Sequence, residues 1–275
     1  MLKQRIYTVF VILPLVLLAI FLLSTRSLSV LAAMLIGWAG WEWSALVSKP
    51  APKWLRTLYT LIVLALLPVA HSLVLLWIPG VVALWIWASV AVIAYAKGWR
   101  PLGFQYNWVK ACFGILILPG AWLSIIRLHG ENGGSPTLLL FVLVLVWAVD
   151  IGAYFVGRFK GKHILAQRVS PNKTWEGFWG GVGLSLLIAI IAGLFHWPLP
   201  LRLLVLLALL TALFAVFGDL FESMLKRQAN VKDTGALLPG HGGILDRIDS
   251  LLAGLPIFAL GLSYHAVYEA LTRLS

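Results

Sequence analysis

The chain of 275 residues is 61% hydrophobic and 11% charged, with a mean hydropathy of +0.96. This composition excludes an ordinary soluble domain and indicates a protein that crosses a membrane several times. The formal net charge of +11 indicates cationic loops, which membrane proteins retain on the cytoplasmic side. Such loops also attract anionic lipid headgroups and phosphates. The single cysteine, Cys112, allows no internal disulfide.

Nine apolar runs approach the roughly 20 residues that a spanning helix needs. We therefore predict an all-α, polytopic membrane protein with about nine transmembrane helices, forming one domain over residues 1–275. The first run follows a charged start and has no convincing cleavage site, so we interpret it as an uncleaved helix. The sequence leaves open whether the first two runs span fully, and Pro79-Gly80 predicts a tight turn between two others. The runs are 7–24, 28–47, 56–78, 80–96, 108–128, 137–156, 177–196, 201–222 and 250–271.

Positive charge supports this alternation. With the N-terminus in the cytoplasm, 17 of the 21 Lys and Arg residues fall on the cytoplasmic side. Two segments rich in polar residues, 157–176 and 223–249, then face the cytoplasm. We therefore expect the chemically rich loops at the cytoplasmic face of the membrane.

Acidic residues inside apolar runs are costly, so each needs a reason. Asp150 and Asp219 lie near the cytoplasmic ends of their runs and could converge on one site, or each could reach water alone. Asp219, Glu222 and Lys226 share one face if the segment is helical. An ordinary Glu222–Lys226 ion pair explains that spacing as well as a functional site does. Glu42 indicates either an interfacial level or a polar contact inside the bundle.

The segment 223–249 joins carboxylates, cations and glycines. Asp246 and Asp249 are three residues apart at the start of the last run, where acids favour a helix N-terminus. That explanation suffices for Asp249. Asp246 also follows Gly240-His241-Gly242-Gly243, where backbone N–H groups can approach an anion, and a hard cation is expected beside such a loop. A lone histidine such as His241 more often has a structural role than a ligand role. The sequence has no Cys/His cluster, which argues against a zinc site.

The segment 157–176 offers further phosphate ligands. Ser170, Asn172 and Lys173 can donate hydrogen bonds to a phosphate or a base, although a basic anchor with a Ser-Pro turn fits equally well. The glycines at 177–183 indicate a closely packed helix face. No Walker-type loop or dinucleotide fingerprint occurs in the sequence.

Together these motifs point to a family. S-M-L-K-R, then K-D, then L-P-G-H-G-G-I-L-D-R-I-D, between Ser223 and Asp249, closely resembles the motif of phosphatidate cytidylyltransferases. S-P-N-K-T-W-E-G at Ser170–Gly177 is similar to a second feature of that family. The first hundred residues add only hydrophobicity to the match.

The resemblance implies that CTP and phosphatidate give CDP-diacylglycerol and pyrophosphate, with Mg²⁺ and room for a monovalent cation such as K⁺. It also implies a homodimer embedded in membrane lipids, which we expect to be those of a bacterial cytoplasmic (inner) membrane. We expect no nucleic-acid partner. It makes Asp219 and Asp246 the metal-site candidates, with Lys226 as a third catalytic candidate. The candidate substrate-binding residues are Ser170, Asn172, Lys173, Arg227, Lys232, His241 and Arg247. The roles of Glu42, Asp150, Glu222 and Asp249 stay open.

Three other functions fit the sequence less well. A CTP-dependent lipid kinase would have to activate a hydroxyl group, and the loop offers no clear base for that step. A secondary transporter would place its polar groups near the bilayer midplane, whereas here they gather at one face. The aspartate-rich pattern of CDP-alcohol phosphotransferases, D-G-x-x-A-R, does not occur in the sequence.

Overall fold

The computed structural model describes residues 2–48, 51–131, 133–195, 199–235, 237 and 242–274, with side chains placed between positions 10 and 265. These residues form nine helices and one small hairpin, so the predicted all-α class is confirmed apart from the hairpin. The helices are α1 (Leu2–Leu22), α2 (Thr25–Val47), α3 (Lys53–Ser72), α4 (Val74–Ala96), α5 (Asn107–Gly130), α6 (Pro136–Lys160), α7 (Trp175–Leu194), α8 (Leu201–Gln228) and α9 (Leu245–Leu274).

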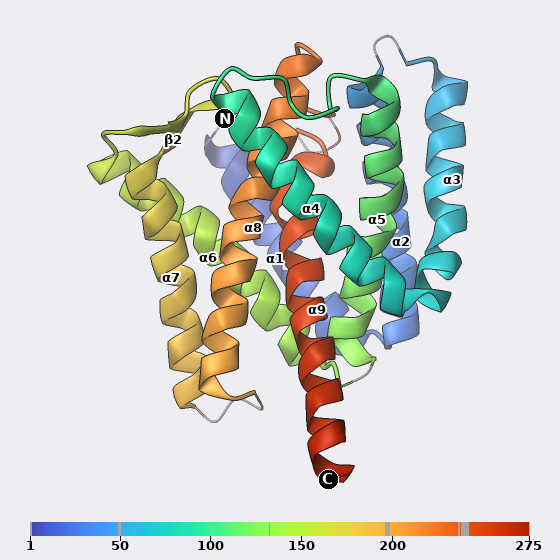
Figure 1. Ribbon diagram of the computed structural model, residues 1–275, viewed down its shortest axis with the longest axis vertical. Helices are drawn as coiled ribbons and strands as arrows, with labels where there is room; N and C mark the ends of the chain where they lie inside the picture. Colours follow the sequence, from blue (N-terminus) through green and yellow to red (C-terminus); the bar gives the residue numbers. More distant parts are fainter. Residues whose placement is uncertain are drawn as a thin grey trace.

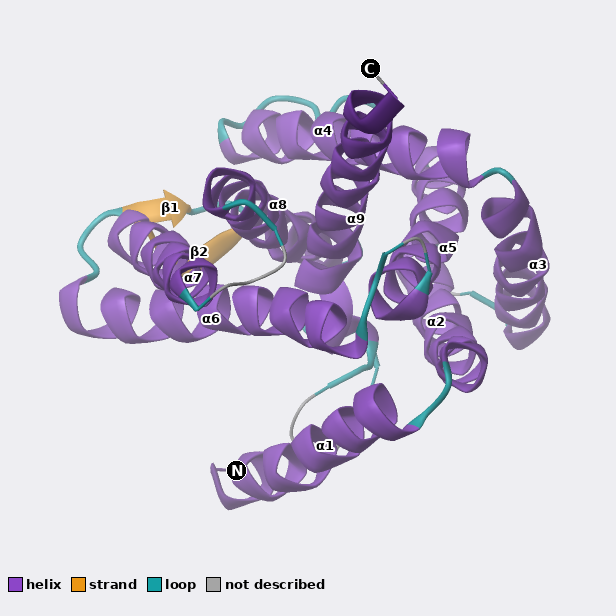
Figure 2. Ribbon diagram, turned by 90° about the horizontal axis from the view of Figure 1, so that it is seen from below, coloured by secondary structure: helices purple, strands orange, loops and turns teal. Residues whose placement is uncertain are grey.

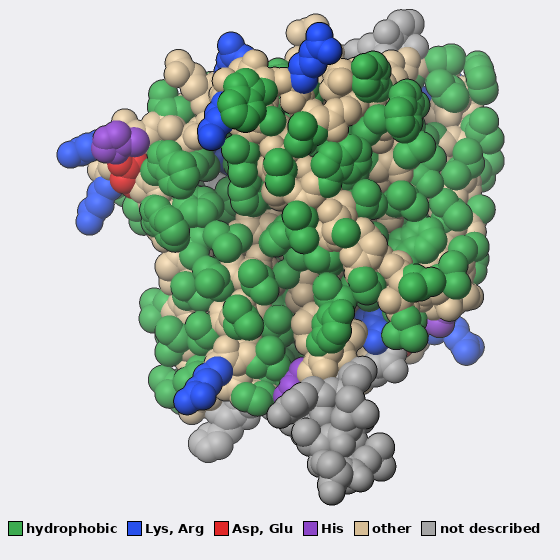
Figure 3. All heavy atoms as spheres, in the orientation of Figure 1, with side chains coloured by type: hydrophobic (Ala, Val, Ile, Leu, Met, Phe, Trp, Pro, Cys, Tyr) green, Lys and Arg blue, Asp and Glu red, His purple; other side chains and the backbone are tan. Residues whose placement is uncertain are grey.

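Seven of these helices, α2 to α8, are long and apolar enough to cross a membrane. Helix α1 contributes a shorter apolar segment, Phe10–Leu22, among the described side chains. Figure 3 shows apolar side chains covering the middle of the visible face, with Lys and Arg toward its two ends. Since a helix satisfies its own backbone hydrogen bonds, this arrangement suits a bilayer.

The predicted turn at Pro79-Gly80 is wrong. Both residues lie inside α4, and the chain instead breaks at Leu73, between the end of α3 at Ser72 and the start of α4 at Val74. Proline and glycine are tolerated in membrane helices because neighbouring groups satisfy the freed backbone. A Pro-Gly pair therefore predicts a turn less reliably inside an apolar membrane segment than in a soluble protein.

The segment between α6 and α7 forms an antiparallel hairpin, which the sequence analysis did not predict. Strand β1 (Ile164–Ala166) pairs with β2 (Ser170–Thr174), with Ile164 opposite Thr174. The Thr174 hydroxyl accepts a hydrogen bond from the Gly177 backbone N–H and so caps α7. The hairpin lies at the upper left of Figure 1, at the same end as the C-terminal end of α8 and the start of α9.

Helices α6 and α7 pack closely through glycines, as predicted for 177–183. A Cβ atom on Gly180 would lie 2.5 Å from Val156, and one on Gly181 would lie 2.5 Å from the Val149 carbonyl oxygen. Gly183 takes no part, because its Cβ would meet nothing within 4 Å. The close α6–α7 pair fixes the base of the hairpin.

Figure 2 shows α6, α7 and α8 grouped on one side and α2, α3 and α5 on the other, with α9 between them. Buried aromatic rings join the two groups. Phe221 of α8 contacts Trp43 of α2, Trp85 of α4 and Phe113 of α5, with ring centroids 4.8–6.3 Å apart. Because Glu42 and Glu222 adjoin two of these rings in sequence, the cluster sets where α2 and α8 present their carboxylates.

Candidate functional site

Helix α8 presents its polar residues at its C-terminal end, as the sequence spacing predicted. Asp219, Glu222 and Lys226 lie within the helix, which continues to Gln228, so Ser223 to Arg227 are helical and do not belong to a loop. The Lys226 ammonium contacts Glu222 Oε2 at 2.6 Å. The predicted helical ion pair is therefore present.

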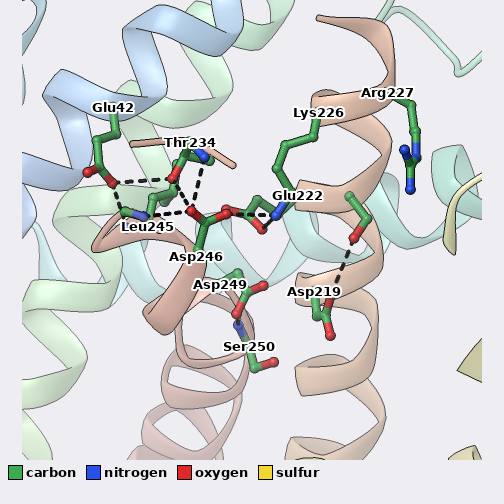
Figure 4. Close-up of polar contacts among 12 residues, drawn as sticks. Glu42, Asp219, Glu222, Lys226, Arg227, Thr234, Leu245, Asp246, Asp249 and Ser250 are labelled. Carbon is green, nitrogen blue, oxygen red and sulfur yellow. Dashed lines mark hydrogen bonds and ion pairs between the residues drawn. The ribbon is translucent and has the colours of Figure 1, made fainter. Parts of the chain in front are cut away.

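Lys226 also reaches α9. Its ammonium donates to Asp246 Oδ1 at 2.8 Å, so one lysine joins two carboxylates from two helices (Figure 4). The side chains are well covered: Asp246 is 5% exposed, Lys226 15% and Glu222 2%. Removing one member of such a buried group leaves an uncompensated charge.

The second oxygen of Asp246 is occupied by the chain itself. Asp246 Oδ2 accepts from the Gly243 N–H at 2.8 Å, the Thr234 N–H at 3.0 Å and the Thr234 hydroxyl at 2.9 Å. Burial alone would raise the pKa of Asp246, which precedes the last apolar run. The hydrogen bonds from Lys226, Gly243 and Thr234 outweigh that effect and hold the pKa below its ordinary value.

Asp219 joins the two polar segments. It forms an ion pair with Lys173 of β2, and Ser223 donates to its Oδ1 at 3.4 Å. Both ion-pair partners are partly open, with Asp219 27% and Lys173 28% exposed. The hairpin therefore docks on α8 beside a carboxylate that water can still reach.

Further charges surround Asp219 and Glu222. Asp150 of α6 lies close enough to interact electrostatically with Asp219, Lys173 and Arg247. Asp249 of α9 interacts in the same way with Glu222, Asp219 and Asp150. Asp150 therefore lies near Asp219, and it is also exposed, so both features that the sequence allowed, proximity to Asp219 and access to water, are present. The interactions of Asp249 make a helix-end explanation insufficient for this residue, which is the fifth residue of α9.

The other predicted substrate ligands differ in their placement. Arg227 points to the opposite side of α8 from Lys226 (Figure 4), and its Nε donates to the Val169 carbonyl at 3.2 Å, which ties the hairpin to α8. Lys232 and Arg247 are exposed. On β2, Asn172 is exposed and Ser170 half-buried, and neither side chain hydrogen-bonds to another described residue. His241 lies outside the described residues.

The glycine-rich loop was predicted to approach an anion, and it does so inside the protein. A Cβ on Gly242, whose φ is +80°, would lie 2.6 Å from Asp246 Oδ2. A Cβ on Gly243 would lie 2.4 Å from Glu42 Oε2. The carboxylates of Asp246 and Glu42 thus leave no room for a side chain at Gly242 and Gly243.

Glu42 is the polar residue that the sequence left without a role. It is buried on α2, and its carboxylate accepts hydrogen bonds from the segment that leads into α9. The cost of an acid within an apolar run indicated that a partner must exist. That partner is about two hundred residues away in the chain, so spacing could not identify it.

The donor set suits a hard cation. Around Lys173, Lys226 and Arg247 the carboxylates outnumber the cations, and Glu222 Oε1 is buried without a hydrogen-bond partner among the described residues. No group of three or more described His, Cys, Asp or Glu residues is arranged to hold a metal ion by itself. Mg²⁺ commonly takes one or two carboxylates together with substrate phosphates, so these residues fit it. The carboxylates in question are Asp150, Asp219, Glu222, Asp246 and Asp249.

A comparison with known proteins identifies the family of this chain. Residues 3–265 match the model of the cytidylyltransferase family, which covers nearly the whole chain. The chain belongs to the cytidylyltransferase family. Membership confirms the resemblance found in the motifs and makes the protein a nucleotidyltransferase enzyme.

Individual cytidylyltransferases are similar over the same length. The phosphatidate cytidylyltransferase of Pseudomonas aeruginosa is 42% identical over 271 residues, covering 94% of this chain and 96% of its own. That of Haemophilus influenzae is 35% identical over 291 residues, covering 94% and 98%. The phosphatidate cytidylyltransferase of Bacillus subtilis is 49% identical over 121 residues, which are 44% of this chain and 45% of the relative.

Proposed function

We propose that this cytidylyltransferase is a phosphatidate cytidylyltransferase of phospholipid biosynthesis, which converts CTP and phosphatidate to CDP-diacylglycerol and pyrophosphate. The full-length similarity to the Pseudomonas and Haemophilus relatives carries this proposal. The charged network at the ends of α8 and α9 supports it, because it holds carboxylates and cations at one end of apolar helices. Diacyl tails can then stay in lipid while the headgroup meets CTP from water.

The reaction forms one bond and breaks one bond at the α-phosphorus of CTP. An oxygen of the lipid phosphate attacks that phosphorus, and the bond to the β-phosphate oxygen breaks, so pyrophosphate departs with the electron pair. The nucleophile is already anionic at neutral pH, so no strong base is needed. The protein must bring two anions together and stabilise the charge that develops.

The residues divide this work by their exposure. Lys232 and Arg247 are exposed and meet the phosphates from the water side. Lys226, held by Glu222 and Asp246, contributes a fixed positive charge at the end of α8. Lys173 brings the hairpin to Asp219, with Ser170 and Asn172 on the same strand as further donors to nucleotide or phosphate.

Asp219 and Asp246 are the residues we propose for Mg²⁺, which when bound neutralises phosphate oxygens and the departing pyrophosphate. Asp219 is the more open of the two. A monovalent cation such as K⁺ and a homodimer remain part of the proposal. Cross-linking of the protein in native membranes tests the dimer, and activity in potassium-free buffer tests the monovalent cation.

We propose that the site faces the cytoplasm of a bacterial inner membrane, on the basis of the charge distribution. Lys162 and Lys232 are both exposed. Cysteines placed there, in a variant without the exposed Cys112, should react with an impermeant maleimide only after the cytoplasmic side is opened. Labelling of either cysteine from outside sealed cells would overturn this orientation.

The acceptor tests the function. Purified protein should form CDP-diacylglycerol from CTP and phosphatidate when Mg²⁺ is present, and should form no lipid product when a chelator removes the metal. Diacylglycerol, which lacks the phosphate, should give no product. Phosphorylation of diacylglycerol or of a polyprenol by CTP would refute the proposal in favour of a lipid kinase.

A further inference from the structure

Glu42 of α2 makes more polar contacts than its place in an apolar run would suggest. It is 2% exposed. Its Oε1 accepts from the Trp38 indole N–H at 3.0 Å and the Ile244 backbone N–H at 3.2 Å. Its Oε2 accepts from the Leu245 backbone N–H at 2.8 Å and lies 3.3 Å from the Thr234 hydroxyl oxygen. Two of these four contacts, Thr234 and Ile244, therefore come from the polar segment between α8 and α9, and a third, Leu245, is the first residue of α9.

These contacts place the carboxylate at the N-terminus of α9. The first N–H groups of a helix have no partner within the helix, and a negative charge there is favourable. The residues just before α9, Gly243 and Ile244, have no side-chain acceptor that could supply a local cap. Glu42 supplies that acceptor from a distant helix, as Figure 4 shows.

The segment is shaped to fit this carboxylate. A Cβ on Gly235 would lie 2.3 Å from Glu42 Oε1, and a Cβ on Gly243 would lie 2.4 Å from Oε2. Such separations are too short for any side chain, so two described glycines of the segment pack directly on Glu42. The buried position of the carboxylate therefore fixes both the start of α9 and the backbone near Thr234.

The same backbone positions hold Asp246. The Thr234 hydroxyl lies 2.9 Å from Asp246 Oδ2 and 3.3 Å from Glu42 Oε2, and its single hydrogen can be donated to only one of them at a time. The N–H of Gly243 donates to Asp246 directly. Glu42 thus packs against the two residues, Thr234 and Gly243, whose donors orient Asp246, and the other oxygen of Asp246 accepts from Lys226.

We propose that Glu42 is a positioning residue for nucleotidyl transfer. It fixes the N-terminus of α9, and through Thr234 and Gly243 it sets the Asp246–Lys226 pair without touching the substrate. The inference rests on the proposed function in taking that pair as part of the active site. Glu42 thereby ties the N-terminal part of the chain to chemistry carried by the C-terminal part.

The variant Glu42→Gln tests this role. Glutamine keeps the size of the side chain, but its NH₂ group would face a backbone N–H where the carboxylate presented an oxygen. Without substrate, we expect hydrogen–deuterium exchange of the 242–250 segment to become at least ~10-fold faster. Turnover should fall by about 10- to 100-fold, the usual effect of losing an outer-shell partner, while the KM for CTP changes less than about 3-fold.

Glu131→Gln is the matched control. Glu131 is a partly exposed carboxylate, 34% exposed, which follows the last residue of α5 and pairs with His71 of α3 at 3.2 Å. We expect neither the exchange of 242–250 nor turnover to change in this variant. Trp38→Phe provides a milder test, because it keeps the carboxylate and removes only the indole N–H that donates to it. This variant should lower kcat about 3-fold and leave the KM for CTP nearly unchanged.

The outcomes separate the two proposals. Glu42→Gln with normal exchange and normal turnover would refute the positioning role. A failure of Glu42→Gln to fold, together with unchanged kcat in Trp38→Phe, would refute it as well. By contrast, a wild-type protein that forms no CDP-diacylglycerol would refute the proposed function, whatever the exchange experiment shows.

Discussion

Asp219 and Asp246 are both proposed metal ligands, yet the protein treats them differently. Asp246 is 5% exposed, and both of its oxygens are occupied by donors from the chain. Asp219 is 27% exposed, and its contacts are a lysine from the hairpin and a serine one turn away. The comparison separates a carboxylate that organises the site from one that remains open to a ligand.

The largest effect should follow from Asp246→Asn. The substitution removes a charge that neutralises Lys226 and orders the segment at Thr234 and Gly243. We expect turnover to fall at least ~100-fold and the free energy of unfolding in detergent to fall by about 3 kcal/mol or more. Activity assays and thermal unfolding of the same preparation measure both quantities. A fully stable Asp246→Asn protein would contradict the organising role.

Asp219→Asn should affect activity alone. Its ion pair with Lys173 is partly exposed, and such pairs contribute about 1 kcal/mol or less to stability. We expect turnover to fall at least ~100-fold with little change in the unfolding temperature. The same unfolding assay provides the check. If Asp219→Asn and Asp246→Asn lost equal stability, the distinction between the two carboxylates would be wrong.

Two basic residues should give smaller and different effects. Arg227→Ala removes the hydrogen bond to Val169 that ties the hairpin to α8, and we expect turnover to fall about 5-fold, equal to ~1 kcal/mol.

Lys232→Ala removes an exposed charge and should raise the KM for CTP about 2-fold, less so at high salt. Steady-state kinetics at two salt concentrations test both variants. An effect of Lys232→Ala on kcat alone would remove it from substrate binding.

Much of the fold could be predicted because a bilayer imposes simple rules. Apolar run length gave the helices, and the positions of Lys and Arg gave a consistent alternation. The break at Leu73 was missed because Pro79-Gly80 has a stronger turn signal, although α4 accommodates both residues. The hairpin was missed because β1 has only three residues, Ile164–Ala166, and β2, Ser170–Thr174, is polar and contains a proline, so neither shows a clear strand pattern.

The site could be predicted only in part. Helical spacing brought Asp219, Glu222 and Lys226 together, and the motif indicated Asp246. The bond from Lys226 to Asp246 and the pair of Lys173 with Asp219 join separate segments, so no local pattern predicts them. Glu42 shows this limit most clearly, because its burial required a partner that only the folded chain identifies.

The account depends most directly on which phosphorus atom of CTP moves to the lipid. Purified protein should be given phosphatidate with CTP labelled either at the α-phosphate or at the γ-phosphate. Cytidylyl transfer predicts that the α-label appears in the lipid product and that the γ-label appears in pyrophosphate, in equal amounts. Appearance of the γ-label in the lipid, with CDP left behind, would contradict the account.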